Sequence, residues 1–343
     1  MQHEKTIHLN SKIKTLKKMF YFVFKLIITI VILVYLLSLV PLNEYRHVLM
    51  LLSIKSVISI LMLVIGQVFL LASRWYLLAK YQGSTLSISG AIYGILMSFF
   101  FSQGLPASIG GDAFRLWWHR REGIATDSAL KIIFFDRIYG LFSLVILCLM
   151  SLILLVNLLG IHSYFISLSI VVVVIGGGLV LLFMPWQLGL SARFNLYSYC
   201  IIPKIRPILH WIIGIRDTLR KQSIAVTTAL LMLSMVTHTL VVTQIYVIGH
   251  CFSPEKINML LCFAAVPPAL LVSYMPFSIA GWGVREASMV IAFGFFGIAA
   301  SIAILVSLTI GMSVFAISLL GGTLWIMGGF RAAYRNRLND HPI

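Results

Sequence analysis

Long apolar runs, rather than alternating or amphipathic patterns, dominate this chain. A helix needs about 20 consecutive apolar residues to cross the hydrocarbon core of a membrane. Runs of that length predict six spanning helices, at residues 20–40, 48–73, 138–159, 163–185, 223–249 and 300–328. Two more apolar regions, 88–118 and 257–298, are broken near the middle by proline, glycine and arginine. We interpret each of these two as a helical hairpin that enters the membrane and returns.

Composition and charge agree with a membrane protein. Hydrophobic residues make up 60% of the 343 residues and charged residues 10%, whereas soluble domains carry about 25% charged residues. The 26 Lys and Arg against 10 Asp and Glu give a formal net charge of +16. Such an excess suggests nucleic-acid binding in a soluble protein, but in a membrane protein basic loops mark the cytoplasmic side. The predicted fold class is an all-α polytopic membrane protein with about six full spans, two re-entrant hairpins and no nucleic-acid partner.

The basic residues also predict the orientation of the chain. They gather in the tails 1–19 and 331–343 and on connections that the predicted spans place on the same side, so both termini are expected in the cytoplasm. Between the tails we expect one transmembrane domain, 20–330, made of a first half, a loop and a second half at 20–185, 186–222 and 223–330. Apolar and basic residues recur at helical spacing in the loop, which predicts a helix in the headgroup layer. A plain connector between the halves is the alternative.

An internal repeat links the two broken regions. Residues 105–115 align without a gap with residues 275–285, at an offset of 170 positions. The identical positions are Pro106 and Pro276, Ser108 and Ser278, Ile109 and Ile279, Gly111 and Gly281, and Arg115 and Arg285. Because three predicted spans separate the copies, the hairpins would enter from opposite faces. We therefore predict an inverted-topology repeat, a common plan of transporters, with a parallel duplication as the alternative.

The repeated motif combines a helix break with positive charge. Proline removes a backbone donor and ends a helix, and Ser108 or Ser278 can cap the helix that follows. The free N–H groups at a helix N-terminus favour an anion, and arginine presents five donors suited to phosphate. We therefore predict that Arg115 and Arg285 bind an anion together, from opposite halves.

Neighbouring residues complete the candidate site. Predicted ligand contacts, besides the two arginines, are Ser108, Gly110, Gly111, Asp112, Ser278, Gly281, Gly283 and Glu286. A gating or structural role is predicted for Pro106, Pro276, Asp136 and Arg137. The alternative is that ion pairs between sequence neighbours merely fix the hairpins: Asp112 with Arg115, Asp136 with Arg137, and Arg285 with Glu286. Ionisable groups at membrane depth favour the functional interpretation, whereas Arg74, before Trp75 and Tyr76, is interpreted as an interfacial anchor.

No catalytic or metal-binding motif accompanies these residues. The nine histidines show no HxxxH spacing, and the chain has no P-loop, no GxSxG and no clustered aspartate pair. We therefore expect neither an enzyme nor a cofactor or metal site.

Three blocks, taken in order, resemble a known family. They are GGDxxR at 110–115, Asp136-Arg137, and GxGxRE at 281–286. Together they are similar to the lysylphosphatidylglycerol synthase transmembrane family, also called the flippase-like domain family, over about residues 20 to 330. The resemblance implies a multi-pass protein of the bacterial inner membrane that is related to a lipid translocator. We expect a stand-alone member without the soluble aminoacyltransferase domain found in the multiple peptide resistance factor.

The leading hypothesis is therefore a lipid translocase. It would bind an anionic phospholipid or a polyprenyl-phosphate-linked sugar between the two hairpins and move the headgroup across the bilayer. The alternative is a non-catalytic accessory membrane subunit of a glycosyltransferase or lipid-modifying enzyme. A third hypothesis, an intramembrane lipid transferase with Asp112 or Glu286 as base, lacks a visible second catalytic group.

Overall fold

The computed structural model describes residues 52–104, 109–159, 222–274 and 282–328, together with the single residues 34, 50, 214, 215 and 218. In these ranges the chain forms eight helices. They are α3 (Ile54–Tyr81), α4 (Ile88–Gly104), α5 (Ile109–Arg121), α6 (Thr126–Leu159), α10 (Ile224–Phe252), α11 (Met259–Ser273), α12 (Val284–Gly294) and α13 (Ala300–Ile326). The predicted all-α fold is confirmed.

Four of these helices are long and apolar enough to cross a membrane: α3, α6, α10 and α13. They correspond to four of the six predicted runs, so the chain is a polytopic membrane protein. α6 begins at Thr126, well before the predicted start at residue 138. Of the polar residues in these added turns, Thr126 and Asp127 are exposed, whereas Asp136 is buried. The predicted spans 20–40 and 163–185 lie outside the described residues, as do both tails and most of the 186–222 loop.

The two broken regions each form a pair of short helices. α4 packs against α5 in the first region, and α11 packs against α12 in the second. The breaks themselves, 105–108 and 275–281, lie outside the described residues, and with them the following candidates: Pro106, Ser108, Pro276, Ser278 and Gly281. α12 begins at Val284, so Gly283 occupies the N-cap position that the sequence analysis assigned to Ser278. The entry of these helix pairs into the membrane remains a prediction.

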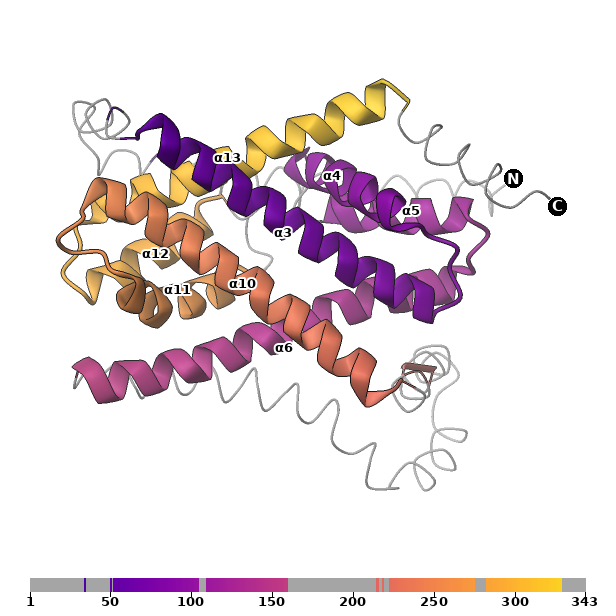
Figure 1. Ribbon diagram of the computed structural model, residues 1–343, viewed down its shortest axis with the longest axis horizontal. Helices are drawn as coiled ribbons and strands as arrows, with labels where there is room; N and C mark the ends of the chain where they lie inside the picture. The colour runs from indigo at the N-terminus through magenta and orange to yellow at the C-terminus, as the bar shows by residue number, and fades with distance from the viewer. Residues whose placement is uncertain are drawn as a thin grey trace, which may run out of the picture.

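The repeat extends over four helices in each half of the chain. α3 to α6 follow the order long, short, short, long, and α10 to α13 follow it again. α3 and α10 begin at Ile54 and Ile224, at the same offset as the short motif. The contacts repeat too, since α4 packs along α13 while its counterpart α11 packs along α6 (Figure 1). The two halves therefore have equivalent structures, and the first short helix of each half packs against the last long helix of the other.

The central pair of the molecule, α3 and α10, runs antiparallel (Figure 1). Near the start of α3, Cys251 Sγ lies 3.3 Å from Ser56 Oγ. Near the middle of α3, Gln67 Nε2 donates to Gln244 Oε1 at 3.0 Å. An axis that exchanges two antiparallel helices is perpendicular to both, so it lies in the membrane plane if the helices cross the membrane. This geometry is that of an inverted repeat.

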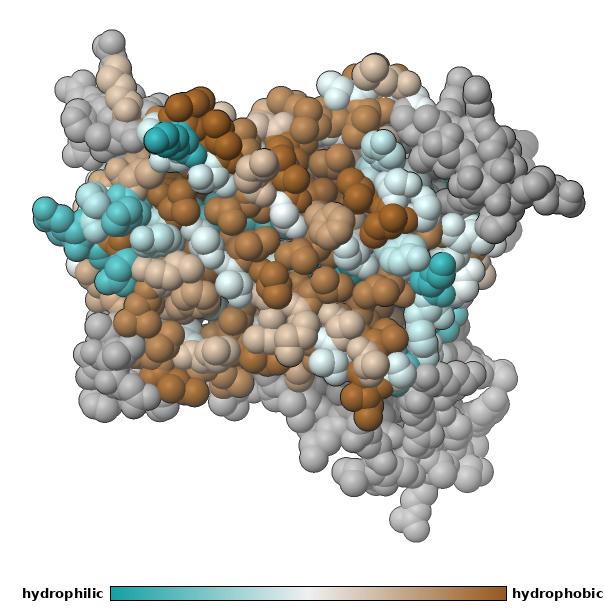
Figure 2. Space-filling model, viewed as in Figure 1, coloured by the Kyte–Doolittle hydropathy of each residue, from teal (hydrophilic) through white to brown (hydrophobic). Residues whose placement is uncertain are grey.

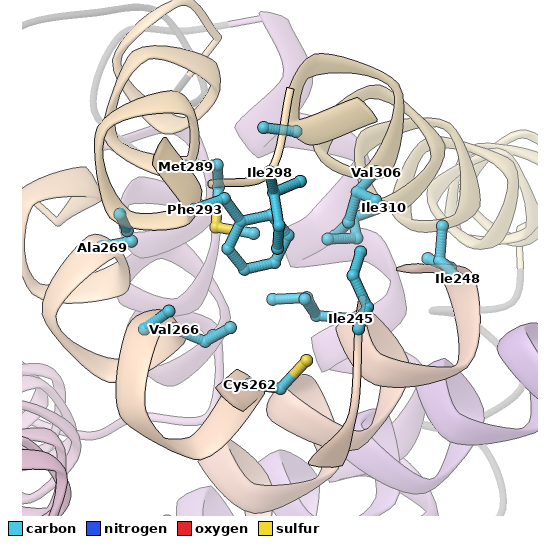
Figure 3. Close-up of a cluster of buried hydrophobic side chains, with 14 of the residues drawn as sticks. Ile245, Ile248, Cys262, Val266, Ala269, Met289, Phe293, Ile298, Val306 and Ile310 are labelled. Atoms are coloured by element: carbon cyan, nitrogen blue, oxygen red, sulfur yellow. The ribbon is translucent and has the colours of Figure 1, made fainter. Parts of the chain in front are cut away.

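Each half has its own hydrophobic core. In the second half, Phe293 of α12 lies among side chains from α10, α11 and α13 (Figure 3). The first half has a matching core that contains Trp75, Ile95, Phe114 and Ile132, one from each of its four helices. A smaller cluster around Cys148 joins α6 to α11. Each core also takes side chains from the other half: Ile60 of α3 joins the second core, and Leu230 of α10 and Ile317 of α13 join the first.

The outer surface of the central helix pair is apolar. Large side chains of α3 are exposed at helical spacing, at Ile54, Ile58, Met62, Ile65 and Phe69. Figure 2 shows hydrophobic residues over most of this face. A patch of this extent is unfavourable in water but suits contact with lipid chains, which agrees with a membrane-spanning role for α3 and α10.

The contact between α13 and α4 depends on Gly321. A Cβ at this position would overlap the backbone carbonyl of Leu96, and small residues are what allow membrane helices to approach so closely. We predict that Gly321→Ala lowers the thermal melting temperature in detergent, with a cost of about 1–3 kcal/mol.

Gly294 provides the matched control because a Cβ there would meet nothing within 4 Å. Gly294→Ala should melt like the unchanged protein or slightly higher. Equal melting temperatures for Gly321→Ala and Gly294→Ala would show that the close contact between α13 and α4 does not contribute to stability.

Candidate functional site

A buried cluster of three ionised side chains lies where α3, α5 and α6 meet. Asp136 of α6 accepts a hydrogen bond from Arg74 Nε at 2.6 Å and another from Arg115 Nη1 at 2.7 Å. The two arginines use different carboxylate oxygens. Side-chain exposure is only 7% for Arg74, 8% for Arg115 and 4% for Asp136. The aspartate therefore bridges two guanidinium groups inside the protein.

The surroundings of this cluster are aromatic and sparsely polar. The Arg115 guanidinium lies 5.2 Å from the centre of the Trp75 ring, a favourable cation–π contact. Ser234 of α10 accepts a hydrogen bond from Arg74 Nη1 at 2.9 Å. Arg115 Nε, in contrast, is buried and has no hydrogen-bond partner among the described residues. One donor of the cluster therefore remains unsatisfied.

The charges of the cluster do not balance. Two arginines, which stay protonated in proteins, face a single carboxylate. Among the described residues, the nearby carboxylate of Asp112 is paired with Arg137 at 2.8 Å instead. Burying an unmatched charge costs several kcal/mol, so a site of this kind gains stability from one further anion.

The ion pairs connect different helices rather than sequence neighbours. The sequence analysis gave pairs of Asp112 with Arg115 and of Asp136 with Arg137 as its alternative interpretation. Both pairs are wrong, because Asp112 contacts Arg137 and Asp136 contacts Arg115. Consecutive residues point about 100° apart on a helix, so Asp136 faces the helix junction while Arg137 does not. The Asp112–Arg137 pair is also more exposed, at 28% and 43%.

Arg74 is the site residue that the sequence analysis missed. Its interpretation as an interfacial anchor is wrong, since it is 6% exposed and bound to Asp136. One signal in the sequence could have located it. Gln67, also buried, lies two helical turns earlier in the same apolar run, which places both polar side chains on one face of α3.

The second half holds a different cluster around Glu286, which is fully buried. Glu286 Oε1 accepts hydrogen bonds from Arg285 Nη2 at 2.6 Å and from Ser307 Oγ at 2.9 Å. Its Oε2 accepts one from the Gly283 backbone N–H at 2.6 Å. The predicted Arg285–Glu286 pair is confirmed. Glu286 therefore neutralises Arg285 and also accepts a hydrogen bond from a backbone N–H at the N-terminus of α12.

The two clusters are equivalent in position but not in charge. Arg115 contacts Asp136 of α6, the long helix that follows α5, and Arg285 contacts Ser307 of α13, the long helix that follows α12. The acidic residue of the second half comes instead from α12 itself, next to the arginine. The first half therefore has a surplus positive charge, whereas the second half is neutral.

The motif glycines serve packing and turning in the described residues. Gly110 and Gly111 are buried, and a Cβ on Gly111 would lie 2.8 Å from the Ser98 carbonyl oxygen of α4. Gly283 has a φ of 85°, a conformation that only glycine adopts easily. These glycines bring the short helices together and start α12.

Arg115 and Arg285 lie in separate clusters, and no hydrogen bond or ion pair among the described residues joins them. A polar chain runs between the halves instead. Gln67 of α3 donates to Gln244 of α10, which donates to Ser313 Oγ of α13 at 2.8 Å. The two halves are therefore connected through buried amides.

An apolar groove of about 580 Å³ opens on the outer side of α3 and α10. Its lining is almost entirely apolar and comes from Ser73, Tyr76, Leu77, Ile88, Ala229, Met232, Leu233 and Val236. Two of these residues, Ser73 and Leu233, directly precede Arg74 and Ser234. The groove and the buried ion cluster therefore lie at the same level of the helix pair.

The sequence model of the lysylphosphatidylglycerol synthase TM region matches residues 22–322. The chain belongs to this family. The match covers both halves of the structural repeat, so the family region includes both ion clusters and the groove. No curated protein matches the chain.

The Arg285–Glu286 pair and the more exposed Asp112–Arg137 pair should differ in their contribution to stability. We predict that Glu286→Gln destabilises this member of the lysylphosphatidylglycerol synthase TM family by about 3 kcal/mol, because it removes a fully buried carboxylate and leaves the partly buried Arg285 without a counter-charge. Asp112→Asn removes the same charge from a partly exposed pair and should cost about 1 kcal/mol or less. Thermal melting in detergent measures both. A larger loss for Asp112→Asn would contradict the assignment.

Proposed function

We propose that this protein is a lipid translocase of the bacterial inner membrane, with both termini in the cytoplasm and without catalytic activity. Its cargo is an anionic phospholipid or a polyprenyl-phosphate-linked sugar. The observation that carries the proposal is the buried cluster of Arg74, Arg115 and Asp136, in which a positive charge is unmatched and a guanidinium N–H is unpaired.

The chemistry of the cluster suits a phosphate group. Arginine binds phosphate through several N–H donors at once, and intramembrane ionisable groups that face a protein interior commonly mark substrate pathways. Arg74 and Arg115 hold the phosphate in this proposal. Arg285, which Glu286 holds in the described arrangement, is the corresponding contact in the second half.

The groove favours a lipid over a soluble anion. Its apolar lining lies at the same level of α3 and α10 as Arg74 and Ser234, and a hydrocarbon chain is the ligand that such a lining accepts. A lipid bound there would place a chain outside the helix pair and its headgroup toward the cluster.

The inverted repeat supports movement of the cargo rather than mere binding. Two equivalent halves related by an inverted repeat can rock against each other about a central site, which exposes that site to alternate faces of the membrane. The partly exposed Asp112–Arg137 pair, between α5 and α6, serves as a gate beside the cluster.

Vesicles that contain the purified protein provide the test. Dithionite bleaches NBD-labelled phosphatidylglycerol only in the outer leaflet, so complete bleaching reports translocation. Arg115→Gln should slow it by at least about tenfold, since a charge-assisted hydrogen bond is worth about 1.5–3 kcal/mol. Arg115→Lys should also slow it, because lysine lacks the planar fork of donors. An NBD-labelled polyprenyl phosphate tests the other lipid class in the same way.

Arg120 provides the matched control. It lies on the same helix as Arg115, is exposed and donates to Thr126, so Arg120→Gln removes the same charge without touching the cluster. The Arg120→Gln variant should translocate the labelled lipids at the same rate as the unchanged protein. If the unchanged protein moves neither lipid, the translocase proposal fails and the accessory-subunit hypothesis is favoured.

A further inference from the structure

The geometry of Asp136 resembles that of a bound phosphate group. One carboxylate oxygen receives Arg74 Nε and the other receives Arg115 Nη1, at 2.6 and 2.7 Å. Two oxygens of a phosphate would meet two guanidinium groups in the same way. Asp136 therefore occupies the position that an anionic ligand of the two arginines would take.

The Asp136 carboxylate does not balance the charge of the two arginines or accept from all their donors. It supplies one negative charge to two arginines, and within the described part of the chain Arg115 Nε is buried without a partner. A phosphate group has more acceptor oxygens than a carboxylate and can bind that donor as well. The site is consequently a better match for phosphate than for the residue that fills it.

Asp136 is also placed so that it can leave. It belongs to α6, whereas Arg74 and Arg115 belong to α3 and α5, so a shift of α6 would withdraw the carboxylate from both arginines. Glu286 in the second half cannot do this. It is adjacent to Arg285 on α12 and is fixed by the Gly283 N–H and Ser307.

We propose that Asp136 is an internal substitute for the lipid phosphate: it neutralises Arg74 and Arg115 when the site is empty and is displaced when the lipid binds. This inference rests on the proposed function and adds a mechanism to it. Ligand entry then requires α6 to move relative to α5, which couples binding to a change in helix packing. Asp136 competes with the ligand instead of contacting it.

A binding measurement distinguishes a competitor from a ligand contact, because the two predict opposite signs. We use dihexanoyl phosphatidylglycerol and the purified protein in detergent, with inorganic phosphate and dihexanoyl phosphatidylcholine as comparison ligands. Asp136→Asn should bind phosphatidylglycerol at least about tenfold more tightly than the unchanged protein, whereas Arg115→Gln should bind it at least about tenfold more weakly. Binding of inorganic phosphate with the same pattern would assign the site to the phosphate alone.

Asp136→Asn leaves two buried arginines without a counter-charge, so it can fail to fold. A second comparison avoids this problem. Arg74→Gln and the double variant Arg74→Gln/Asp136→Asn share a single arginine and differ only at Asp136. The double variant should bind phosphatidylglycerol more tightly, and the ligand should raise its melting temperature more.

The outcomes separate this inference from the proposed function. If removal of the Asp136 carboxylate weakens binding in both comparisons, Asp136 positions the arginines and the inference is overturned, while the translocase proposal stands. If the unchanged protein and every variant bind phosphatidylglycerol no better than phosphatidylcholine, both proposals fail.

Discussion

The cost of holding charge inside an apolar protein is the constraint on which this structure depends. The interior offers no water to solvate Arg74 and Arg115, so α6 must supply Asp136 at the point where α3 and α5 meet. The part of α6 that precedes its apolar run contains Asp136, so this extension of the helix places the counter-charge inside the protein. The packing of α3, α5 and α6 against one another therefore also places the counter-charge beside the two arginines.

The two halves of the repeat share one helix arrangement, but their ion clusters differ in net charge. α12 and α13 form a closed group in which Arg285, Glu286 and Ser307 satisfy one another. The corresponding place in the first half keeps a surplus positive charge and an unpaired donor. The helix arrangement is thus the same in both halves, while the acidic partner of the motif arginine comes from α6 in the first half and from α12 in the second.

Much of the fold could be predicted from the sequence, because apolar run length alone specifies helices such as α10 and α13. The eleven-residue motif at 105–115 and 275–285 likewise revealed a repeat that extends to whole helices. The partners of the charged residues could not be predicted in this way. Arg74 and Asp136 lie far apart in the sequence, and only the packing of α3 on α6 brings them together. Local pairing rules therefore assigned Asp112 and Asp136 to the wrong arginines.

The amide pair of Gln67 and Gln244 connects α3 and α10 near the middle of α3. Among the described residues it is one of three polar contacts spread along the two helices, with Ser56 and Cys251 near the start of α3 and Arg74 and Ser234 towards its end. Sliding either helix along the other would break all three contacts together. The two halves are therefore locked in register along their shared seam, like the teeth of two combs.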